Sequence, residues 1–353
     1  MDSTPEAASP PVAAMESNVF SFVAPTEFVQ LPSEGRFYPA NHPLFNEKTI
    51  EIKQMTAKEE DILTSVTLLQ NGVALERLLE SIIVDKSINP KTLLVGDRNA
   101  IVISARVSGY GNTYKTEITC PHCATEQKHN FDLNEAIVRK TSDILSSLPE
   151  NISVTDEGLF SVTLPKSQLN VVLRLFDGND ENILNKQLEN DRKQKTDKLV
   201  TTQLRHMIQS VNGNNTQEAI DYVSHNLPSS DSAFLRKIYK LIVPNIELNL
   251  GFTCRACSHT EDMEVPLTAD FFGLSSEYME NVYEHFFFLK HFGGWSFVEA
   301  YNLPIGLRDW FVNRLAEHME AEQNAQKAAS SGNNVKTLSA ANQPPPPPSV
   351  NVK

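Results

Sequence analysis

The sequence predicts an α+β protein, with a helical cluster, two cysteine-bearing strand knuckles, an α+β insertion between the knuckles and a helical C-terminal segment. Three observations lead to this prediction. Apolar residues keep helical spacing up to about residue 110 and then alternate as in strands, two Cys-x-x-Cys motifs lie between such strands, and a helical, aromatic-rich pattern returns after residue 272. The 353 residues, 40% of them apolar, are enough to bury a sizeable core.

The first part of the chain predicts two strands and three helices. Strands are expected at residues 27–31 and 48–54. Thr56 precedes Glu59 by three residues, which is the capping box that starts a helix. The second helix is predicted from helical spacing, which is kept by Leu75, Leu78, Leu79, Ile82 and Ile83. A third helix is expected to begin at Asp97 as its N-cap and to end at Gly109-Tyr110-Gly111.

The second half alternates between strand and helix patterns. Residues 159–164 and 169–176 predict a hairpin, Asp180 starts a helix, and a long charged helix is expected from about Glu189 to Val211. Two short helices lead to Pro244, a strand pair surrounds the second cysteine motif, and the rest is helical.

These patterns divide the chain into six expected parts. They are a flexible arm (1–25), the helical cluster with the first knuckle (26–137), the insertion (138–243), the second knuckle (244–272), an aromatic helical segment (273–325) and a disordered Pro-rich tail (326–353).

All four cysteines lie in the two knuckles. The separation of Cys120 and Cys254 is 134 residues, and this shift also aligns Ile118 with Phe252, Thr119 with Thr253, Phe131 with Val265 and Leu133 with Leu267. Two residues between thiolates let one tight turn aim both sulfurs at one ion, and two such turns complete a closed tetrahedral site. The sequence therefore predicts a split zinc ribbon with one structural Zn²⁺ bound by Cys120, Cys123, Cys254 and Cys257.

A redox-active dithiol is the competing interpretation of these cysteines. Such a motif is expected at a helix N-terminus, and neither Cys-x-x-Cys precedes a helical pattern. His122 and His259 lie beside the cysteines and could replace a cysteine as ligand, although exposed knuckle residues are the simpler interpretation.

Charge and targeting signals restrict the class of protein further. The net charge is −13 at pH 7, which disfavours broad contact with nucleic-acid phosphates. The sequence has no apolar run long enough to span a membrane and no signal-peptide pattern at its start, so we expect the protein in a reducing cytoplasm. It also lacks G-x-S-x-G, H-E-x-x-H and Walker motifs, so we expect neither an enzyme nor a small-molecule substrate.

The aromatic helical segment is the predicted partner-binding surface. Its helix with Phe286, Phe287 and Phe288 is apolar on more than one face and must be either buried or covered by a partner. A packed local core and a partner interface are equally compatible with this pattern. Because aromatic anchors dominate interfaces, the binding residues are predicted to be Phe287, Trp295, Tyr301 and Trp310.

Several motifs resemble the baseplate proteins of T4-like contractile-tailed bacteriophages, and most closely the hub and hub-assembly proteins. The resemblance covers about residues 26–325. It is carried by Leu93-Leu94-Val95-Gly96-Asp97-Arg98-Asn99, by Gly109-Tyr110-Gly111, by the two cysteine knuckles, by Leu31-Pro32-Ser33-Glu34-Gly35 and by the Leu164-Pro165-Lys166 hairpin.

This resemblance implies a non-enzymatic viral tail protein that contacts other baseplate hub or tail proteins. It would be found in the host cytoplasm during assembly and, as a permanent subunit, in the baseplate of the virion. The alternative is a zinc-ribbon nucleic-acid-binding protein, but the charges around the knuckles are acidic on balance. An enzyme with an unrecognised site ranks last.

Overall fold

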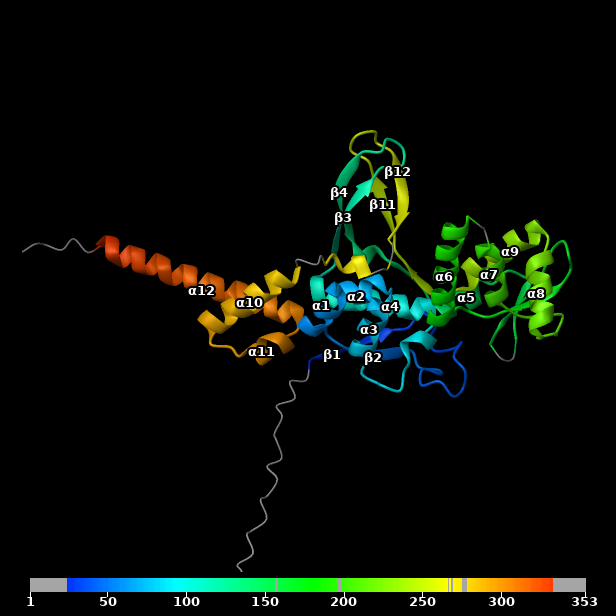
Figure 1. Ribbon diagram of the computed structural model, residues 1–353, viewed down its shortest axis with the longest axis horizontal. Coiled ribbons are helices and arrows are strands. Elements are labelled where there is room, and N and C mark those ends of the chain that lie inside the picture. Colours follow the sequence, from blue (N-terminus) through cyan, green and yellow to red (C-terminus); the bar gives the residue numbers. More distant parts are fainter. Residues whose placement is uncertain are drawn as a thin grey trace, which may run out of the picture.

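The computed structural model describes residues 24–155, 158–195, 198–265, 267, 269–274 and 278–332. These residues form helices and small antiparallel sheets, which confirms the α+β class. Figure 1 shows a central body that carries a projecting pair of β-hairpins, an insertion at one end and a helical C-terminal unit at the other.

The body consists of a two-stranded sheet packed with four helices. Its elements are β1 (Thr26–Gln30), β2 (Thr49–Lys53), α1 (Ala57–Thr64), α2 (Val66–Gln70), α3 (Ala74–Ile82) and α4 (Val95–Tyr110), with a 3₁₀ turn, η1, at Pro90–Thr92. The predicted capping box is present, because the Thr56 backbone N–H donates to Glu59 Oε2 over 2.8 Å and the Thr56 side chain accepts from the first turn of α1. Gly111 ends α4 with a φ of 78°, as the sequence predicted.

The start of α4 differs from the prediction. The helix begins at Val95, so Asp97 lies in its first turn and is not the N-cap. The Val95 backbone N–H donates instead to the carbonyl of Phe176, from a distant segment. This leaves the Asp97 carboxylate free to turn inward, where it is 1% exposed and accepts hydrogen bonds from the Ser33 backbone N–H at 2.9 Å and the Tyr38 hydroxyl at 2.8 Å.

The neighbours of Asp97 in this turn bind other parts of the chain. A Cβ atom on Gly96 would lie 1.9 Å from the carbonyl oxygen of Pro244, so the position requires glycine. Arg98 forms an ion pair with Glu181 of the insertion. Asn99 Nδ2 donates to Asn245 Oδ1 over 3.0 Å. The first turn of α4 therefore joins the N-terminal loop, the insertion and the strand that leads toward the second knuckle.

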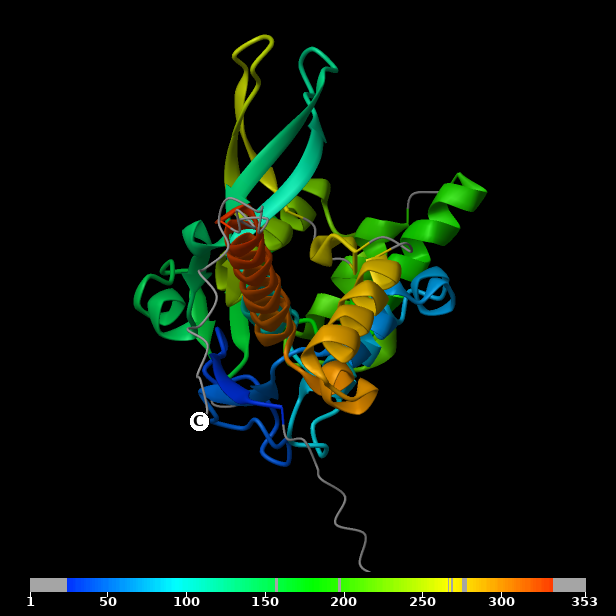
Figure 2. The ribbon, with the colours of Figure 1, turned by 90° about the vertical axis from the view of Figure 1, so that its left-hand side faces the viewer.

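The two cysteine motifs lie at the tips of two projecting hairpins (Figure 2). One hairpin pairs β3 (Thr113–Thr119) with β4 (Glu126–Asp132), and the other pairs β11 (Asn249–Thr253) with β12 (Thr260–Glu264). Short 3₁₀ turns follow them, η2 (Leu133–Glu135) and η3 (Ala269–Phe272). The base of the pair is aromatic, since the ring of Tyr114 lies 5.1 Å from that of Phe271.

The insertion leaves and rejoins the body through one antiparallel ribbon, β5 (Ile137–Arg139) with β10 (Asn245–Glu247). Beyond the ribbon, a four-stranded antiparallel sheet has the order β6-β7-β8-β9. Its elements are α5 (Thr141–Ser146), β6 (Ile152–Val154), β7 (Phe160–Thr163), β8 (Asn170–Leu173), α6 (Gly178–Gln194), α7 (Leu199–Met207), β9 (Ile208–Val211), α8 (Gln217–Asn226) and α9 (Ser229–Ile242). The predicted hairpin is β7–β8.

The prediction of one long helix over residues 189–211 is wrong. Helix α6 ends at Gln194, α7 ends at Met207, and residues 208–211 form strand β9 against β8. Ile208 and Val211 are both buried at a spacing of three, which resembles a helix. A register shift in β9 explains this spacing, because Gln209 is left without a partner on β8 and both apolar residues then face the core.

The C-terminal unit contains α10 (Tyr278–Gly293), α11 (Phe297–Asn302) and α12 (Ile305–Gly332). Residues 326–332, predicted to belong to the tail, continue α12, whereas 333–353 and the arm at 1–23 lie outside the described residues. Within the described part of the chain, each helix is too short or too polar to cross a lipid bilayer.

Two hydrophobic clusters form the interior. One extends through the body, the insertion and the hairpins as far as Cys120 and Cys254, and the other lies among α10–α12 and includes Ala57 of α1. The insertion is therefore held to the body by packing and by the backbone bonds from Val95 to Phe176 and from Gly178 to Leu93, independently of the cysteines.

The two glycines of α4 provide a matched test of the helix junction. Gly96→Ala should lower the free energy of unfolding by about 1 to 3 kcal/mol, because the new methyl collides with the Pro244 backbone. Gly109→Ala should be neutral or stabilising by up to ~1 kcal/mol, since its Cβ would meet its nearest neighbour at 3.6 Å. Urea unfolding would measure both, and equal stability of the two variants would contradict the proposed packing.

Candidate metal centre and partner surface

The two knuckle turns have the same backbone geometry. In the first, the Cys120 N–H donates to the carbonyl of Thr125 and the Ala124 N–H donates back to Cys120. In the second, the same bonds run from Cys254 to His259 and from Ser258 to Cys254. Each turn closes through a residue with positive φ, 55° at Ala124 and 58° at Ser258. The local repeat expected from the 134-residue shift is thus present in the backbone.

These turns bring the four cysteines into one cluster. All four Sγ atoms lie within 4.8 Å of one another. The Sγ atoms of Cys123 and Cys254 are 3.6 Å apart, and those of Cys120 and Cys257 are 3.8 Å apart. Cys120 and Cys254 are buried, whereas Cys123 is exposed, so the cluster lies at the surface of the hairpin tips.

The cluster fits a metal ion bound by four thiolates. A tetrahedral site with metal–sulfur bonds of about 2.3 Å has sulfur–sulfur edges of about 3.8 Å. The Cys120–Cys257 and Cys123–Cys254 separations agree with this value. Hydrogen bonding with Thr125 lowers the pKa of Cys123 to about 6, whereas burial and the neighbouring thiols raise the pKa of Cys257 to about 12, so the fit to a metal rests on the positions of the sulfurs. Four protein ligands complete such a site, so it has no open position for a substrate.

The adjacent histidines are not part of this cluster. The rings of His122 and His259 stack 5.4 Å apart beside the turns, and His259 Nε2 lies 3.3 Å from Glu261 Oε2. Sequence reasoning missed a different neighbour, Gln127, whose side-chain amide contacts the second knuckle at Thr253 and Arg255. A single glutamine within a polar strand gave no signal of this contact.

The four predicted partner-binding residues fall into two groups. Phe287 and Trp310 are 62% and 56% exposed. Trp295 is half-buried, with its ring 4.7 Å from that of Phe311, and the half-buried Tyr301 donates a 2.6 Å hydrogen bond to Asp61. Two of these residues thus lie on the surface, and two contribute to packing within the unit or to its attachment to α1.

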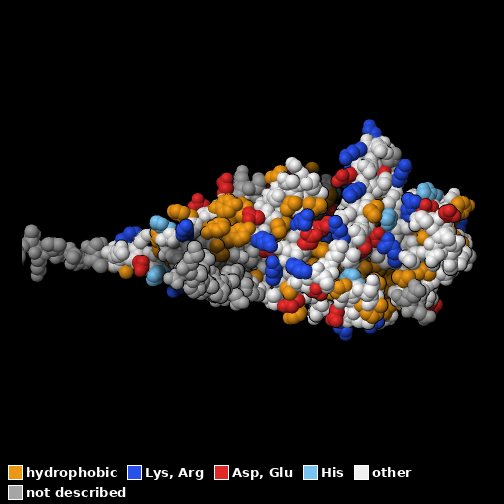
Figure 3. All heavy atoms as spheres, turned by 60° about the horizontal axis from the view of Figure 1, so that its bottom comes forward, with side chains coloured by type: hydrophobic (Ala, Val, Ile, Leu, Met, Phe, Trp, Pro, Cys, Tyr) orange, Lys and Arg blue, Asp and Glu red, His pale blue; other side chains and the backbone are white. Residues whose placement is uncertain are grey.

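Further exposed apolar side chains lie in the same C-terminal unit. Figure 3 shows that hydrophobic side chains gather over the C-terminal helices. We refer to the exposed members of this group as the C-terminal apolar surface; they are Tyr283, Phe287, Phe292, Phe297, Val298, Leu307 and Trp310. Exposed aromatic side chains are candidates for contact with other proteins, because such residues often anchor interfaces.

The C-terminal unit is attached to the body by a buried ion pair. The guanidinium of Arg308 donates to both oxygens of Glu60, at 2.6 and 2.9 Å, and both side chains are almost fully buried. The hydroxyls of Tyr278 and Tyr110 also donate to Glu60, at 2.9 and 3.3 Å. These four hydrogen bonds replace those that the Glu60 carboxylate would form with water.

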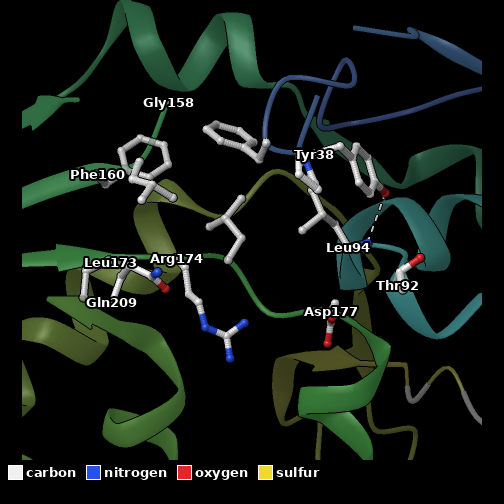
Figure 4. Close-up of a pocket in the computed structure, with 13 residues that line it drawn as sticks. Tyr38, Thr92, Leu94, Gly158, Phe160, Leu173, Arg174, Asp177 and Gln209 are labelled. Atoms are coloured by element: carbon white, nitrogen blue, oxygen red, sulfur yellow. Dashed lines mark hydrogen bonds between the residues drawn. The ribbon is translucent and has the colours of Figure 1, made fainter. Parts of the chain in front are cut away.

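A cavity of about 360 Å³ lies between the N-terminal loop and the insertion (Figure 4). Phe37 and Phe160 form part of its wall, with ring centroids 5.3 Å apart. Its charged residues have structural partners, because Arg174 binds both oxygens of Asp180 and Asp177 caps α6. These charges therefore stabilise the insertion.

Residues 26–273 match a protein family described as the T4 bacteriophage base plate protein. The chain belongs to this family. The matched span is well over half of the chain, contains both knuckles and the insertion, and ends before α10. No curated protein and no solved structure matches the sequence. The resemblance to T4-like baseplate proteins is confirmed, and the family places the protein among other proteins of the phage tail baseplate.

Two arginines of α12 provide a test of the attachment. Arg308→Met should lower the free energy of unfolding of the C-terminal unit by about 3 to 5 kcal/mol, because Glu60 would be left buried without its counter-ion. Arg314→Met removes only an exposed pair with Glu317 and should change stability by less than about 1 kcal/mol. Tryptophan fluorescence during urea unfolding reports on this unit, since both tryptophans lie in it; similar unfolding of the two variants would refute the role of the buried pair.

Proposed function

We propose that this chain is a non-enzymatic component or assembly factor of the baseplate hub, that it acts by protein–protein contacts, and that one structural Zn²⁺ holds its two hairpins together. Family membership supports the baseplate role. The convergence of four thiols at tetrahedral spacing is the observation that supports the metal. A closed four-thiolate site favours Zn²⁺, a structural role and a reducing cytoplasm during assembly.

In this proposal the metal orders the hairpin tips and is not needed to attach the insertion. The hairpins extend from the body as two separate ribbons (Figure 2). Binding of the ion to ligands from both ribbons would fix their relative position, because metal binding is coupled to the ordering of its ligands. The insertion keeps its own contacts with the body, so loss of the metal should loosen the hairpin tips and leave the insertion attached.

The C-terminal apolar surface is the proposed docking site for other hub or tail proteins. Phe287 and Trp310 are the proposed anchors, because they are the two most exposed aromatic side chains of this surface. Trp295 and Tyr301 act by supporting this surface from beneath. The surface lies outside the segment that matches the family, so its partner need not be shared by every member.

The hub role is tested by quantitative mass spectrometry of purified particles beside assembly intermediates from the lysate. A fixed copy number in the particle would establish a permanent baseplate component, and presence only in intermediates would establish an assembly factor. Absence from both would refute the proposal.

The metal is tested with Cys254→Ser. Purified wild-type protein should contain one zinc per chain by elemental analysis, and the variant should lose it together with hydrogen-exchange protection in β3–β4 and β11–β12. The control is His122→Ala, which alters a neighbouring residue outside the thiol cluster and should retain zinc. If the wild-type protein contained no metal after purification under reducing conditions, the zinc assignment would be contradicted.

The docking surface is tested with Phe287→Ala and Trp310→Ala. Each substitution should weaken capture of tail proteins from infected-cell lysate by roughly 30-fold, equivalent to about 2 kcal/mol for an aromatic hot spot. Phe28→Ala on β1 is the matched control, since Phe28 is 70% exposed but lies on the body. Equal capture by all three variants would mean that the surface is not the interface.

A further inference from the structure

The two knuckles are related by a local two-fold pattern. The shift of 134 residues that maps Cys120 onto Cys254 also maps Cys123 onto Cys257. The sulfur pairs Cys120–Cys257 and Cys123–Cys254 are therefore equivalent, and their separations of 3.8 and 3.6 Å are nearly the same. The arrangement of the thiols does not distinguish one hairpin from the other.

One polar contact between the hairpins breaks this symmetry. Gln127, on β4, accepts a hydrogen bond at Oε1 from the Arg255 backbone N–H over 3.0 Å. Its Nε2 donates to the Thr253 carbonyl over 3.3 Å. These two peptide groups lie on either side of Cys254. One amide side chain thus binds the backbone directly around a cysteine of the opposite knuckle.

The equivalent contact in the other direction cannot form. The residue that corresponds to Gln127 is Glu261, and the residue that corresponds to Arg255 is Pro121, which has no backbone N–H to donate. An ionised Glu261 also has no donor for the carbonyl of Thr119. Glu261 instead lies 3.3 Å from His259 within its own hairpin.

We propose that Gln127 is a positioning residue for the metal centre, which holds Cys254 and the second knuckle in register with the first before the ion binds. Within the described residues, Gln127 is the one side chain other than a cysteine that hydrogen-bonds from one hairpin to the other. Pre-positioning lowers the ordering cost that metal binding must overcome, and residues that orient ligands commonly contribute to metal affinity. This inference rests on the proposed metal site.

The test compares Gln127→Ala with Glu261→Ala in the full chain. Both residues occupy equivalent strand positions in polar settings, so each substitution removes a similar side chain from one hairpin. Zn²⁺ affinity is measured by competition with a chromophoric chelator. Gln127→Ala should weaken binding by about 10- to 100-fold, and Glu261→Ala should stay within about twofold of the wild type. Titration with Co²⁺ should give the same thiolate charge-transfer spectrum in all three proteins, because the four ligands are unchanged.

The outcomes separate this inference from the proposed function. If the wild-type protein binds neither Zn²⁺ nor Co²⁺, the proposed metal site itself is contradicted. Binding by the wild type with equal affinity in Gln127→Ala and Glu261→Ala overturns the role of Gln127 and leaves the metal site intact. A changed Co²⁺ spectrum in Gln127→Ala also overturns it, since Gln127 would then alter the set of ligands and not only their position.

Discussion

The first turn of α4 is where distant segments of the chain meet, and the body depends on its close packing. Gly96 lets the helix approach the Pro244 backbone, and Asp97 binds the N-terminal loop through Ser33 and Tyr38. Arg98 and Asn99 then reach the insertion and the strand before the second hairpin. Four consecutive residues with different partners leave little freedom for substitution, because Gly96 must lack a side chain and each of the other three side chains makes a separate contact.

Different interactions hold the insertion and the hairpin tips in place. Backbone hydrogen bonds and a shared hydrophobic cluster hold the insertion against the body, and the β5–β10 ribbon returns the chain to the second hairpin. The long segment between the knuckles is therefore closed without a metal. What remains for the proposed metal site and for Gln127 is the relative position of the two projecting tips.

The C-terminal unit follows a different principle. It has its own small cluster of apolar residues and is attached to α1 by a charged pair supported by two tyrosines. A buried pair of this kind fixes orientation more than it adds stability, since desolvation offsets most of its attraction. A fixed orientation suits a unit whose exposed aromatic residues are the proposed contacts with other baseplate proteins.

The sequence by itself determined the features that depend on neighbouring residues. The capping box at Thr56, the helical spacing in α3, the glycine stop at Gly111 and the alternation into each Cys-x-x-Cys are local signals, and each corresponds to an observed element. The aligned knuckles also predicted their common backbone turn. Only the tertiary structure decided the rest. Pairing with β8 through a bulge made residues 208–211 strand β9, although their spacing resembles a helix. Asp97, predicted as a cap, is buried and binds a distant loop. The packing of the C-terminal helices leaves Phe287 and Trp310 exposed, whereas Tyr301 reaches Asp61. These outcomes depend on partners far away in the sequence, which local patterns do not encode.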